Sequence, residues 1–354
     1  MKKVFLLINF FLCGLFGSLA AQSTDDLDLS SLIQPVDTNS FIRDPMYYSW
    51  CNSFIKGEDG MYHLFYSRWP KSIGFTGWLT HSEIAHAVSS RLEGPYQFKE
   101  VVIKGRPGKW DAITTHNAQI RKFGDKYYLY YTSTNTGDEV WSAEFLKEVG
   151  RVGYGHGKWE VLRSNQRAGV ASAPSLNGPW TRMDSPLVQP AGPIKNVAVN
   201  PSVCQGGKDK FILIIKGDDV TTEKRKLIQA VGTGNTPCGP FRLENKPAFD
   251  DIPTEDVCVW YDEVRARYYA LFHAHGGNFI GLITSEDGTN WQKAKHYRVC
   301  SKQIPLKDGT VMKVSNMERP FVYLENGKPV MLSFAVKKGN DSFIVTFRGK
   351  TDVS

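Results

Sequence analysis

Residues 117–133, NAQIRKFGDKYYLYYTS, contain a short apolar strand, a turn around Gly124 and a second strand rich in tyrosine. Aromatic residues favour strands, so the stretch predicts a β-hairpin. The same pattern of strand, small turn and aromatic or apolar strand occurs four more times along the chain. The other copies are NSFIKGEDGMYHLFYS (52–67), NPSVCQGGKDKFILIIKG (200–217), DVCVWYDEVRARYYALFHA (256–274) and RPFVYLENGKPVMLSFAV (319–336).

The five copies are spaced at roughly constant intervals. Equivalent residues at the start of the second strand are Tyr62, Tyr127, Phe211, Tyr268 and Pro329, so successive steps are 65, 84, 57 and 61 residues. A strand pair repeated at such spacing, without heptads between the copies, indicates small antiparallel sheets arranged around an axis. The sequence therefore predicts an all-β fold, a five-bladed β-propeller.

Length and composition divide the chain into three parts. The chain has 354 residues, of which 41% are apolar, enough for one large core. Residues 1–22 combine two lysines, an apolar run and small residues, and they predict a cleaved signal peptide with export to the periplasm or the medium. Residues 23–40 are a polar leader or a clasp onto the last blade, and 41–354 form a single catalytic propeller domain. No later segment resembles a membrane span.

Charge and cysteine content exclude several classes of partner. Without Lys2 and Lys3 the net charge falls from +7 to +5, and the basic residues are scattered, so no nucleic-acid partner is expected. The five cysteines after the leader are odd in number and lack zinc-ligand spacing. His273 and His275 have no carboxylate or cysteine at ligand spacing, and neither a metal nor a cofactor is expected. The oligomeric state is not predicted.

Polar residues open the first strand of each blade, which in a propeller lines the central channel. Partly desolvated polar side chains that converge on one small volume indicate ligand binding. Alternatively, these residues cap strands and connect the blades by hydrogen bonds. The positions are Trp50 and Cys51, His116 and Asn117, Asn200, Glu255 and Asp256, and Glu318 and Arg319.

Carboxylates from different blades make hydrolysis of glycosidic bonds a candidate chemistry. Asp256 and Glu318 open adjacent blades, and two carboxylates in different environments can act as acid and base. Asp44 and Asp111 precede their axial positions by six and five residues, so both could reach the channel from rim loops. The alternative for Asp44 is an ordinary Asp-Pro turn.

Several of these segments resemble the five-bladed-propeller glycoside hydrolases, a superfamily that includes families 43, 32 and 117. The similar segments are FIRDP (41–45), SEIAHAVS (82–89), HNAQIRKFGDKYYLYYTS (116–133), NPSV (200–203), DVCVWYD (256–262) and MERPFVY (317–323). The resemblance implies an aspartate base in the first blade, an acid from a later blade and a modulating aspartate. It assigns these roles to Asp44, Glu318 and Asp256.

The hypothesis is an exported, exo-acting glycoside hydrolase for oligosaccharides from plant or algal polysaccharides. Its substrate would contact Trp50, Asp111, His116, Asn117, Asn200, Glu255 and Arg319. A first alternative is a non-catalytic carbohydrate-binding propeller, favoured because Trp50 and Asn200 stand where the superfamily has carboxylates. A second is a glycoside phosphorylase, with Lys195, Lys216 and Arg319 near phosphate.

Other residues are expected to shape the site. Trp50, Trp69, Trp78 and Trp110 cluster near predicted loop mouths, where flat rings can stack on sugars, although such tryptophans often pack between blades. Residues 142–152 are expected to form a helical turn or two. They lie in the long connection between the second and third blades, where substrate-shaping loops usually sit.

Overall fold

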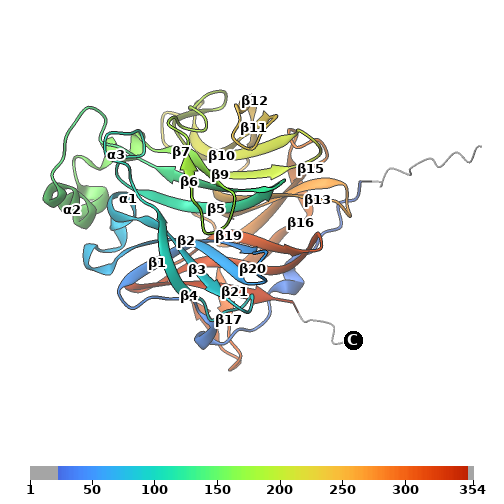
Figure 1. Cartoon of the computed structure of the whole chain (residues 1–354). Helices are drawn as coiled ribbons and strands as arrows, with labels where there is room; N and C mark the ends of the chain where they lie inside the picture. The colour runs from blue at the N-terminus through green and yellow to red at the C-terminus, as the bar shows by residue number, and fades with distance from the viewer. Residues whose placement is uncertain (1–22, 350–354) are drawn as a thin grey trace, which may run out of the picture.

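Antiparallel strands dominate the protein. A computed structural model describes residues 23–349, so the predicted signal peptide lies outside the described residues. The strands form successive sheets in chain order, and their colours in Figure 1 pass from blue to red around the molecule. Within the described part, no helix is long and apolar enough to cross a membrane.

Each predicted hairpin forms the first two strands of one blade. The first blade contains β1 (Tyr47–Lys56), β2 (Tyr62–Pro70), β3 (Glu83–Ser89) and β4 (Gln97–Ile103). The second contains β5 (Thr115–Phe123), β6 (Lys126–Ser133), β7 (Arg167–Ala173) and β8 (Thr181–Arg182). The third contains β9 (Ile194–Gln205), β10 (Phe211–Asp219), β11 (Leu227–Gly234) and β12 (Arg242–Phe249).

The last two blades complete the circle. The fourth contains β13 (Thr254–Asp262), β14 (Arg267–Ala274), β15 (Phe279–Ser285) and β16 (Gln292–Ser301). A small hairpin, β17 (Gln303–Pro305) and β18 (Val311–Lys313), leads to the fifth blade. That blade contains β19 (Asn316–Glu325), β20 (Lys328–Lys338) and β21 (Asp341–Arg348).

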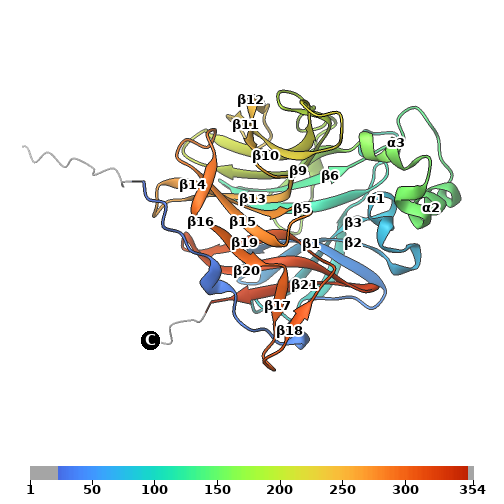
Figure 2. The same ribbon diagram turned by 180° about the vertical axis from the view of Figure 1, so that it is seen from behind.

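The start of the described chain covers the outer edge of the fifth blade. Ile42 pairs with Ile344 of β21 through two backbone hydrogen bonds of 3.0 and 2.9 Å. The preceding leader follows the outer side of the last blades in Figure 2, and Val36 bridges Leu306 on the way. Because an exposed strand edge invites unwanted pairing, this contact protects the last blade as well as joining it to the first.

The three α-helices gather at one side of the molecule (Figure 1). The α-helices are α1 (Trp78–His81), α2 (Ala143–Val152) and α3 (Trp159–Ser164). The 3₁₀ turns are η1 (Ser30–Leu32), η2 (Thr38–Ser40), η3 (Lys71–Ile73), η4 (Phe75–Gly77) and η5 (Gly153–Gly155). The helix expected over 142–152 is confirmed as α2, whose first turn is capped by the Ser142 hydroxyl, which accepts a hydrogen bond from the Phe145 amide at 3.1 Å.

A β-bulge occurs at the same place in the first strand of every blade. The pairing register of each of these strands shifts there. The bulged residues have left-handed backbone angles: φ is 56° at Cys51, 60° at Asn117, 56° at Asn200, 58° at Asp256 and 56° at Arg319. Few non-glycine residues adopt this conformation, so its fivefold recurrence identifies one repeated device. It turns the neighbouring side chains toward the axis.

Polar side chains of the first strands also connect adjacent blades. The Ser53 hydroxyl accepts a hydrogen bond from the Ile120 amide at 2.9 Å, and the Ser202 hydroxyl accepts one from Val259 at 2.9 Å. These residues lie beyond the bulges, and they satisfy buried backbone groups that no strand pairing reaches. These hydrogen bonds connect the first strand of one blade to the first strand of the next.

Candidate active site

A pocket of about 350 Å³ opens at the end of the axis where the helices lie. This volume falls in the range of about 300–1,000 Å³ typical of small-molecule sites. The residue before each bulge forms its floor: Trp50, His116, Val199, Glu255 and Glu318. Each blade thus contributes one side chain to the floor.

The bulged residues close the axis, and three of them, the predicted contacts Asn117, Asn200 and Arg319, also line the pocket. Asn117 Nδ2 donates to Asn200 Oδ1 at 2.5 Å, and Asn200 Nδ2 donates to Asp256 Oδ1 at 2.9 Å. Arg319 Nη1 lies 2.5 Å from the same carboxylate oxygen. With Cys51 these residues surround a much smaller cavity of about 40 Å³. The pocket is therefore closed at its inner end.

Asp256 is held ionised below the pocket floor. Its side chain is buried, with 3% of the residue exposed, and burial alone would raise its pKa. The charge of Arg319, followed by that of His273, instead lowers the pKa of this carboxyl below its ordinary value. His273 Nδ1 lies 2.9 Å from Asp256 Oδ2 without the alignment of a hydrogen bond. Asp256 does not line the pocket, so it acts through its neighbours.

Glu255 lines the pocket and is also held ionised. Burial favours its neutral form, but Lys216 Nζ lies 2.5 Å from Glu255 Oε1 and His275 Nδ1 lies 3.5 Å from Oε2. These cations hold the pKa of Glu255 well below its ordinary range. In return, the hydrogen bond to Glu255 raises the pKa of His275. Because this carboxylate stays ionised near neutral pH, it can accept a proton but cannot supply one as a general acid.

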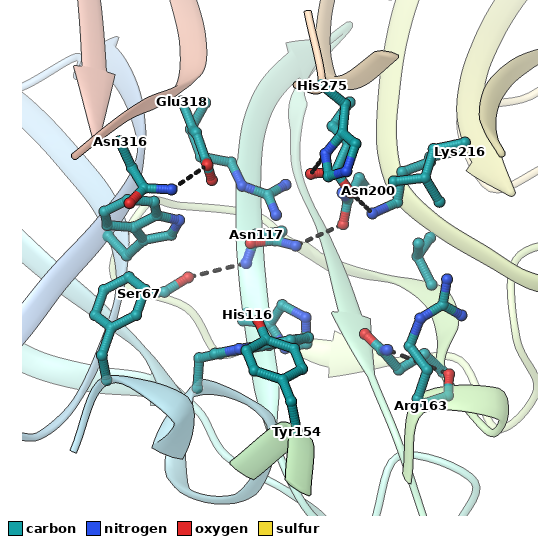
Figure 3. A pocket seen from close by; sticks show the side chains of 18 of the residues that line it. Ser67, His116, Asn117, Tyr154, Arg163, Asn200, Lys216, His275, Asn316 and Glu318 are labelled. Atoms are coloured by element: carbon teal, nitrogen blue, oxygen red, sulfur yellow. Dashed lines mark hydrogen bonds and ion pairs between the residues drawn. The ribbon is translucent and has the colours of Figure 1, made fainter. Parts of the chain in front are cut away.

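Glu318 lies across the pocket from Lys216 (Figure 3). Asn316 Nδ2 donates to Glu318 Oε1 at 2.7 Å, and no described cation forms an ion pair with this carboxyl group. A carboxylate oxygen of Glu318, a carboxylate oxygen of Asp256 and a ring nitrogen of His273 lie within 4.8 Å of one another. Asp256 and Glu318 therefore lie close together at the axis, as the sequence predicts. Of the two, only Glu318 lines the pocket.

His116 presents an unpartnered polar ring to the pocket. The residue is 2% exposed, and neither ring nitrogen makes an aligned hydrogen bond within the described protein, although Gln166 approaches the ring. Burial, with the charges of Arg319 and Lys216, lowers the pKa of His116 to about 3, so the ring is neutral. Buried polar atoms are rarely left without partners, which marks this ring as a ligand contact.

Aromatic rings form the wall around the mouth. The lining includes Trp50, Trp69, Phe75, Trp78, Tyr154 and Trp159. Trp78 meets the His116 ring edge-on at 5.2 Å, and Tyr154, which is 71% exposed, packs on Trp159 at 4.9 Å. Flat apolar faces beside polar groups suit the two sides of a sugar ring.

Three of the four tryptophans expected near the loop mouths line this pocket: Trp50, Trp69 and Trp78. Trp110 does not, and it stacks on Tyr131 with a centroid distance of 6.0 Å. Trp110 thus belongs to the packing within the second blade, the other role that the sequence left open for such residues.

Asp44 and Asp111 lie outside the pocket. The Asp44 carboxylate accepts hydrogen bonds from the backbone amides of Met46 at 2.7 Å and Tyr47 at 3.0 Å, which is the Asp-Pro turn alternative. Asp111 is fully buried between Arg106 at 2.9 Å and Arg182 at 3.1 Å, and it accepts from the Tyr131 hydroxyl. Neither residue is among those that line the pocket, so the structure gives no support to the roles assigned to them.

Two groups of described residues have donor atoms spaced for a metal ion. They are Glu255 with His273 and His275, and Asp256 with His273 and Glu318; within each group the ligand atoms lie within 4.8 Å. Lys216 and Arg319 already place a cation 2.5 Å from Glu255 and Asp256, respectively.

Several pocket residues were not predicted. Tyr154, Trp159, Arg163 and Gln166 come from the connection between β6 and β7, and Arg225 and Leu227 come from the third blade. The 84-residue step between the second and third hairpins signalled an insertion but not which of its residues would reach the axis.

Comparisons with known proteins identify the fold. No family model matches the chain, and no curated protein matches its sequence. The structure is similar to a family 117 glycoside hydrolase from the marine bacterium Zobellia galactanivorans, with a TM-score of 0.60 and 16% identity over 89% of this chain and 88% of that chain.

It is also similar to an alpha-L-arabinofuranosidase from Lactobacillus brevis, with a TM-score of 0.57 and 14% identity over 88% of this chain and 94% of that chain. An endo-arabinase from Bacteroides thetaiotaomicron matches with a TM-score of 0.55 and 11% identity, over 90% and 98% of the two chains. The predicted five-bladed propeller and its likeness to propeller glycoside hydrolases are thereby confirmed. Identity this low establishes the fold alone.

Proposed function

We propose that this protein is an exo-acting glycoside hydrolase that removes a terminal sugar from oligosaccharides of plant or algal origin. The observation that carries the proposal is the presence of Glu255 and Glu318, from adjacent blades, in the floor of one pocket. Glycoside hydrolysis uses two carboxyl groups that flank the bond to be cleaved. The fold, which glycoside hydrolases share, supports the same conclusion.

In the proposed mechanism Glu318 is the general acid and Glu255 the general base. Glu318 makes no ion pair with a described cation, so it can carry the proton that the leaving oxygen requires. Glu255 is kept ionised by Lys216 and His275 and can accept a proton from water. This assignment keeps the acid expected from sequence and moves the base from Asp44 to Glu255.

Asp256 acts as a positioning residue in this scheme. It fixes Arg319 through a 2.5 Å ion pair and contacts His273, which also lies 3.6 Å from Glu255. Through His273 its charge therefore helps orient Glu255. This agrees with the modulating role that the family resemblance implies.

The closed floor supports exo action. A chain of hydrogen bonds from Asn117 through Asn200 to Asp256 blocks passage along the axis, so a polysaccharide cannot thread through. A sugar chain end can enter the mouth and stack on the aromatic wall. Export, predicted from residues 1–22, would bring the enzyme to such oligosaccharides outside the cytoplasm.

The test is hydrolysis of a panel of plant and algal oligosaccharides, with identification of the sugar released. On the best substrate, Glu318→Gln and Glu255→Gln should each lower kcat by roughly 10²–10⁴-fold, the usual contribution of an acid or base. Asp44→Asn is the matched control and should retain near-wild-type kcat. The anomer first released reports whether the two carboxyl groups act in one displacement or two.

Two results would replace this proposal. Sugar binding without turnover by the wild-type protein would favour the carbohydrate-binding propeller. Product formation that requires phosphate would favour the phosphorylase. Of the residues expected near phosphate, Lys195 donates to the Thr222 carbonyl and does not line the pocket, and Lys216 and Arg319 are each paired with a carboxylate.

A further inference from the structure

The side of the pocket opposite Glu318 is basic. Figure 3 shows Arg163 and Lys216 on one side, and Asn316 and Glu318 on the other. Arg225, from the connection between β10 and β11, also lines the pocket. The basic groups are therefore concentrated in one part of the wall.

Lys216 is neutralised locally, but the arginines are not. Lys216 has its own carboxylate in Glu255. Arg163 and Arg225 share one buried carboxylate, that of Asp218, with Arg163 Nη2 at 2.8 Å from Oδ1 and Arg225 Nε at 4.0 Å from Oδ2. Two guanidinium groups against one buried carboxylate leave an excess positive charge on this wall.

Glu160, which pairs with Arg225 at the surface, offsets little of this excess positive charge inside the pocket. Arg225 Nη2 lies 3.0 Å from Glu160 Oε1, but both side chains are about half exposed. Such surface pairs are strongly screened by water and salt. The buried Arg163 pairs with Asp218 through Nη2, and water and salt screen its remaining donor, Nη1, much less.

Arg163 also has a donor that no described group uses. Only 8% of the residue is exposed, and its Nη1 has no hydrogen-bond partner within residues 23–349. A buried N–H group without a partner forfeits the hydrogen bonds it made in water, so proteins rarely leave one there unless a ligand completes it. Since Arg163 lines the pocket, such a ligand would sit beside the sugar.

We propose that Arg163, assisted by Arg225, binds an anionic group carried by the substrate, either a sugar carboxylate or a sulfate ester. This inference rests on the proposed function and names its substrate class: acidic rather than neutral oligosaccharides. A guanidinium group matches two oxygens of such an anion with parallel N–H donors. The acidic side of the pocket, with Glu318, remains free for the glycosidic oxygen.

The test is calorimetric binding to the wild-type protein, which requires no turnover. The probes are tri-galacturonate with its methyl ester, and a sulfated galactan tetrasaccharide with its desulfated form. At least one acidic probe should bind roughly ten- to hundredfold more tightly than its neutral counterpart, the effect of a charge-assisted hydrogen bond. The preferred probe identifies carboxylate or sulfate as the group recognised.

Two variants and one control connect the preference to this wall. Arg163→Met should abolish most of the discrimination, and Arg225→Met, which alters a half-exposed residue and leaves the fold intact, should reduce it. Arg151→Met is the control, because Arg151 lies on α2 in the same insertion but does not line the pocket. Thermal unfolding verifies that each variant is folded.

Three outcomes would overturn the inference: equal affinity for the charged and neutral probes, unchanged discrimination in Arg225→Met, or saturable binding of inorganic phosphate that accelerates product formation. Hydrolysis of neutral oligosaccharides without charge preference would reject the acidic substrate class and leave the hydrolase proposal standing. Tight binding of an acidic probe with no turnover of any sugar would reject the hydrolase proposal while supporting the anion site.

Discussion

Two rings of residues that are neighbours in sequence have opposite roles at the axis. The floor ring, Trp50, His116, Val199, Glu255 and Glu318, faces the pocket. The bulge ring, Cys51, Asn117, Asn200, Asp256 and Arg319, includes a chain of hydrogen bonds and an ion pair, and Asn117, Asn200 and Arg319 also reach the pocket. One residue step along each strand separates the floor ring from the ring whose side chains bond across the axis to the next blade.

The difference shows how a propeller can separate stability from chemistry. The bulge ring uses its charges internally, with Arg319 against Asp256. In the floor ring, His116 keeps both nitrogens without aligned partners and Glu318 has no described cationic partner. Substitutions in the bulge ring should therefore affect mainly stability, and those in the floor ring mainly substrate binding and turnover.

The largest effect on stability is expected from Arg319→Met in the bulge ring. Removing the guanidinium leaves Asp256 buried beside fewer cations, and breaking a buried ion pair typically costs about 3–5 kcal/mol. The adjacent floor residue provides the contrast: Glu318→Gln should change the free energy of unfolding by less than about 1 kcal/mol. Urea denaturation of both variants measures the difference. Equal destabilisation by the two substitutions would contradict the division between the rings.

A smaller loss is expected for Asn200→Ala. The substitution removes the hydrogen bonds to Asn117 and Asp256, worth about 1–3 kcal/mol for buried groups. It also places an alanine at a φ of 56°, which adds about 1–2 kcal/mol.

Asn200→Gly separates these two contributions. Glycine loses the same hydrogen bonds but adopts the left-handed conformation without the Cβ clash, so Asn200→Gly should be about 1 kcal/mol more stable than Asn200→Ala. Chemical denaturation of both variants gives the comparison. An alanine variant as stable as the glycine variant would show that backbone strain at the bulge is unimportant.

Much of this axial arrangement could be predicted from sequence. The hairpin repeat is local, so turn residues and apolar strands reveal it, and one repeated strand start fixes which side chains converge. That reasoning correctly brought Glu255, Glu318 and His116 to a common site. The residue types signal the bulges only in part: Asn117, Asn200 and Asp256 are of types that tolerate left-handed backbone angles, but Cys51 and Arg319 are not.

The insertion and the rim could not be predicted in the same way. Arg163 reaches the pocket because the insertion that contains α2 and α3 folds back toward the axis. This arrangement depends on tertiary packing of α2 against α1 and the neighbouring 3₁₀ turns, and strand periodicity gives no sign of it. Asp44 failed for the opposite reason. Its distance from the axial position suggested that it could reach the channel, but a local turn captures its carboxylate first. Hydrogen bonds two or three residues away form at little entropic cost.

His116→Phe tests the floor ring where it has unused polar atoms. The change removes two buried nitrogens without aligned partners, so the free energy of unfolding should stay within about 1 kcal/mol of wild type or rise. KM for the sugar should increase, because a ligand contact is lost.

His63→Phe is the matched control for this substitution. His63 is equally buried but has partners, with Nδ1 at 2.7 Å from His86 Nε2 and Nε2 at 3.2 Å from Asp59. It should cost about 1–3 kcal/mol and leave KM unchanged. Equal stability losses for the two substitutions would indicate that His116 is bonded within the protein after all.

The smallest effect concerns pH and the His275–Glu255 contact at the edge of the floor ring. Glu255 raises the pKa of His275 above its ordinary value of 6.5 in the folded state. A raised pKa means that the contact stabilises the protein fully below pH 6.5 and that this contribution disappears as the pH rises through the folded pKa. Since 53% of the His275 side chain is exposed, the contribution should remain below about 1 kcal/mol.

Comparing His275→Gln with wild type from pH 5 to pH 9 isolates this contribution from that of other titrating groups. The wild-type protein should be more stable at pH 5–6, and the difference should shrink toward pH 9, where the imidazole is neutral in both states. The Glu255 carboxyl does not confuse the result, because its lowered pKa affects stability only as the pH falls toward and below its ordinary value of 4.5. A difference that grows as the pH rises would have the wrong sign for a protonated His275. That result would mean that Lys216 alone neutralises Glu255. The contact between His275 and Glu255 would then not titrate near neutral pH.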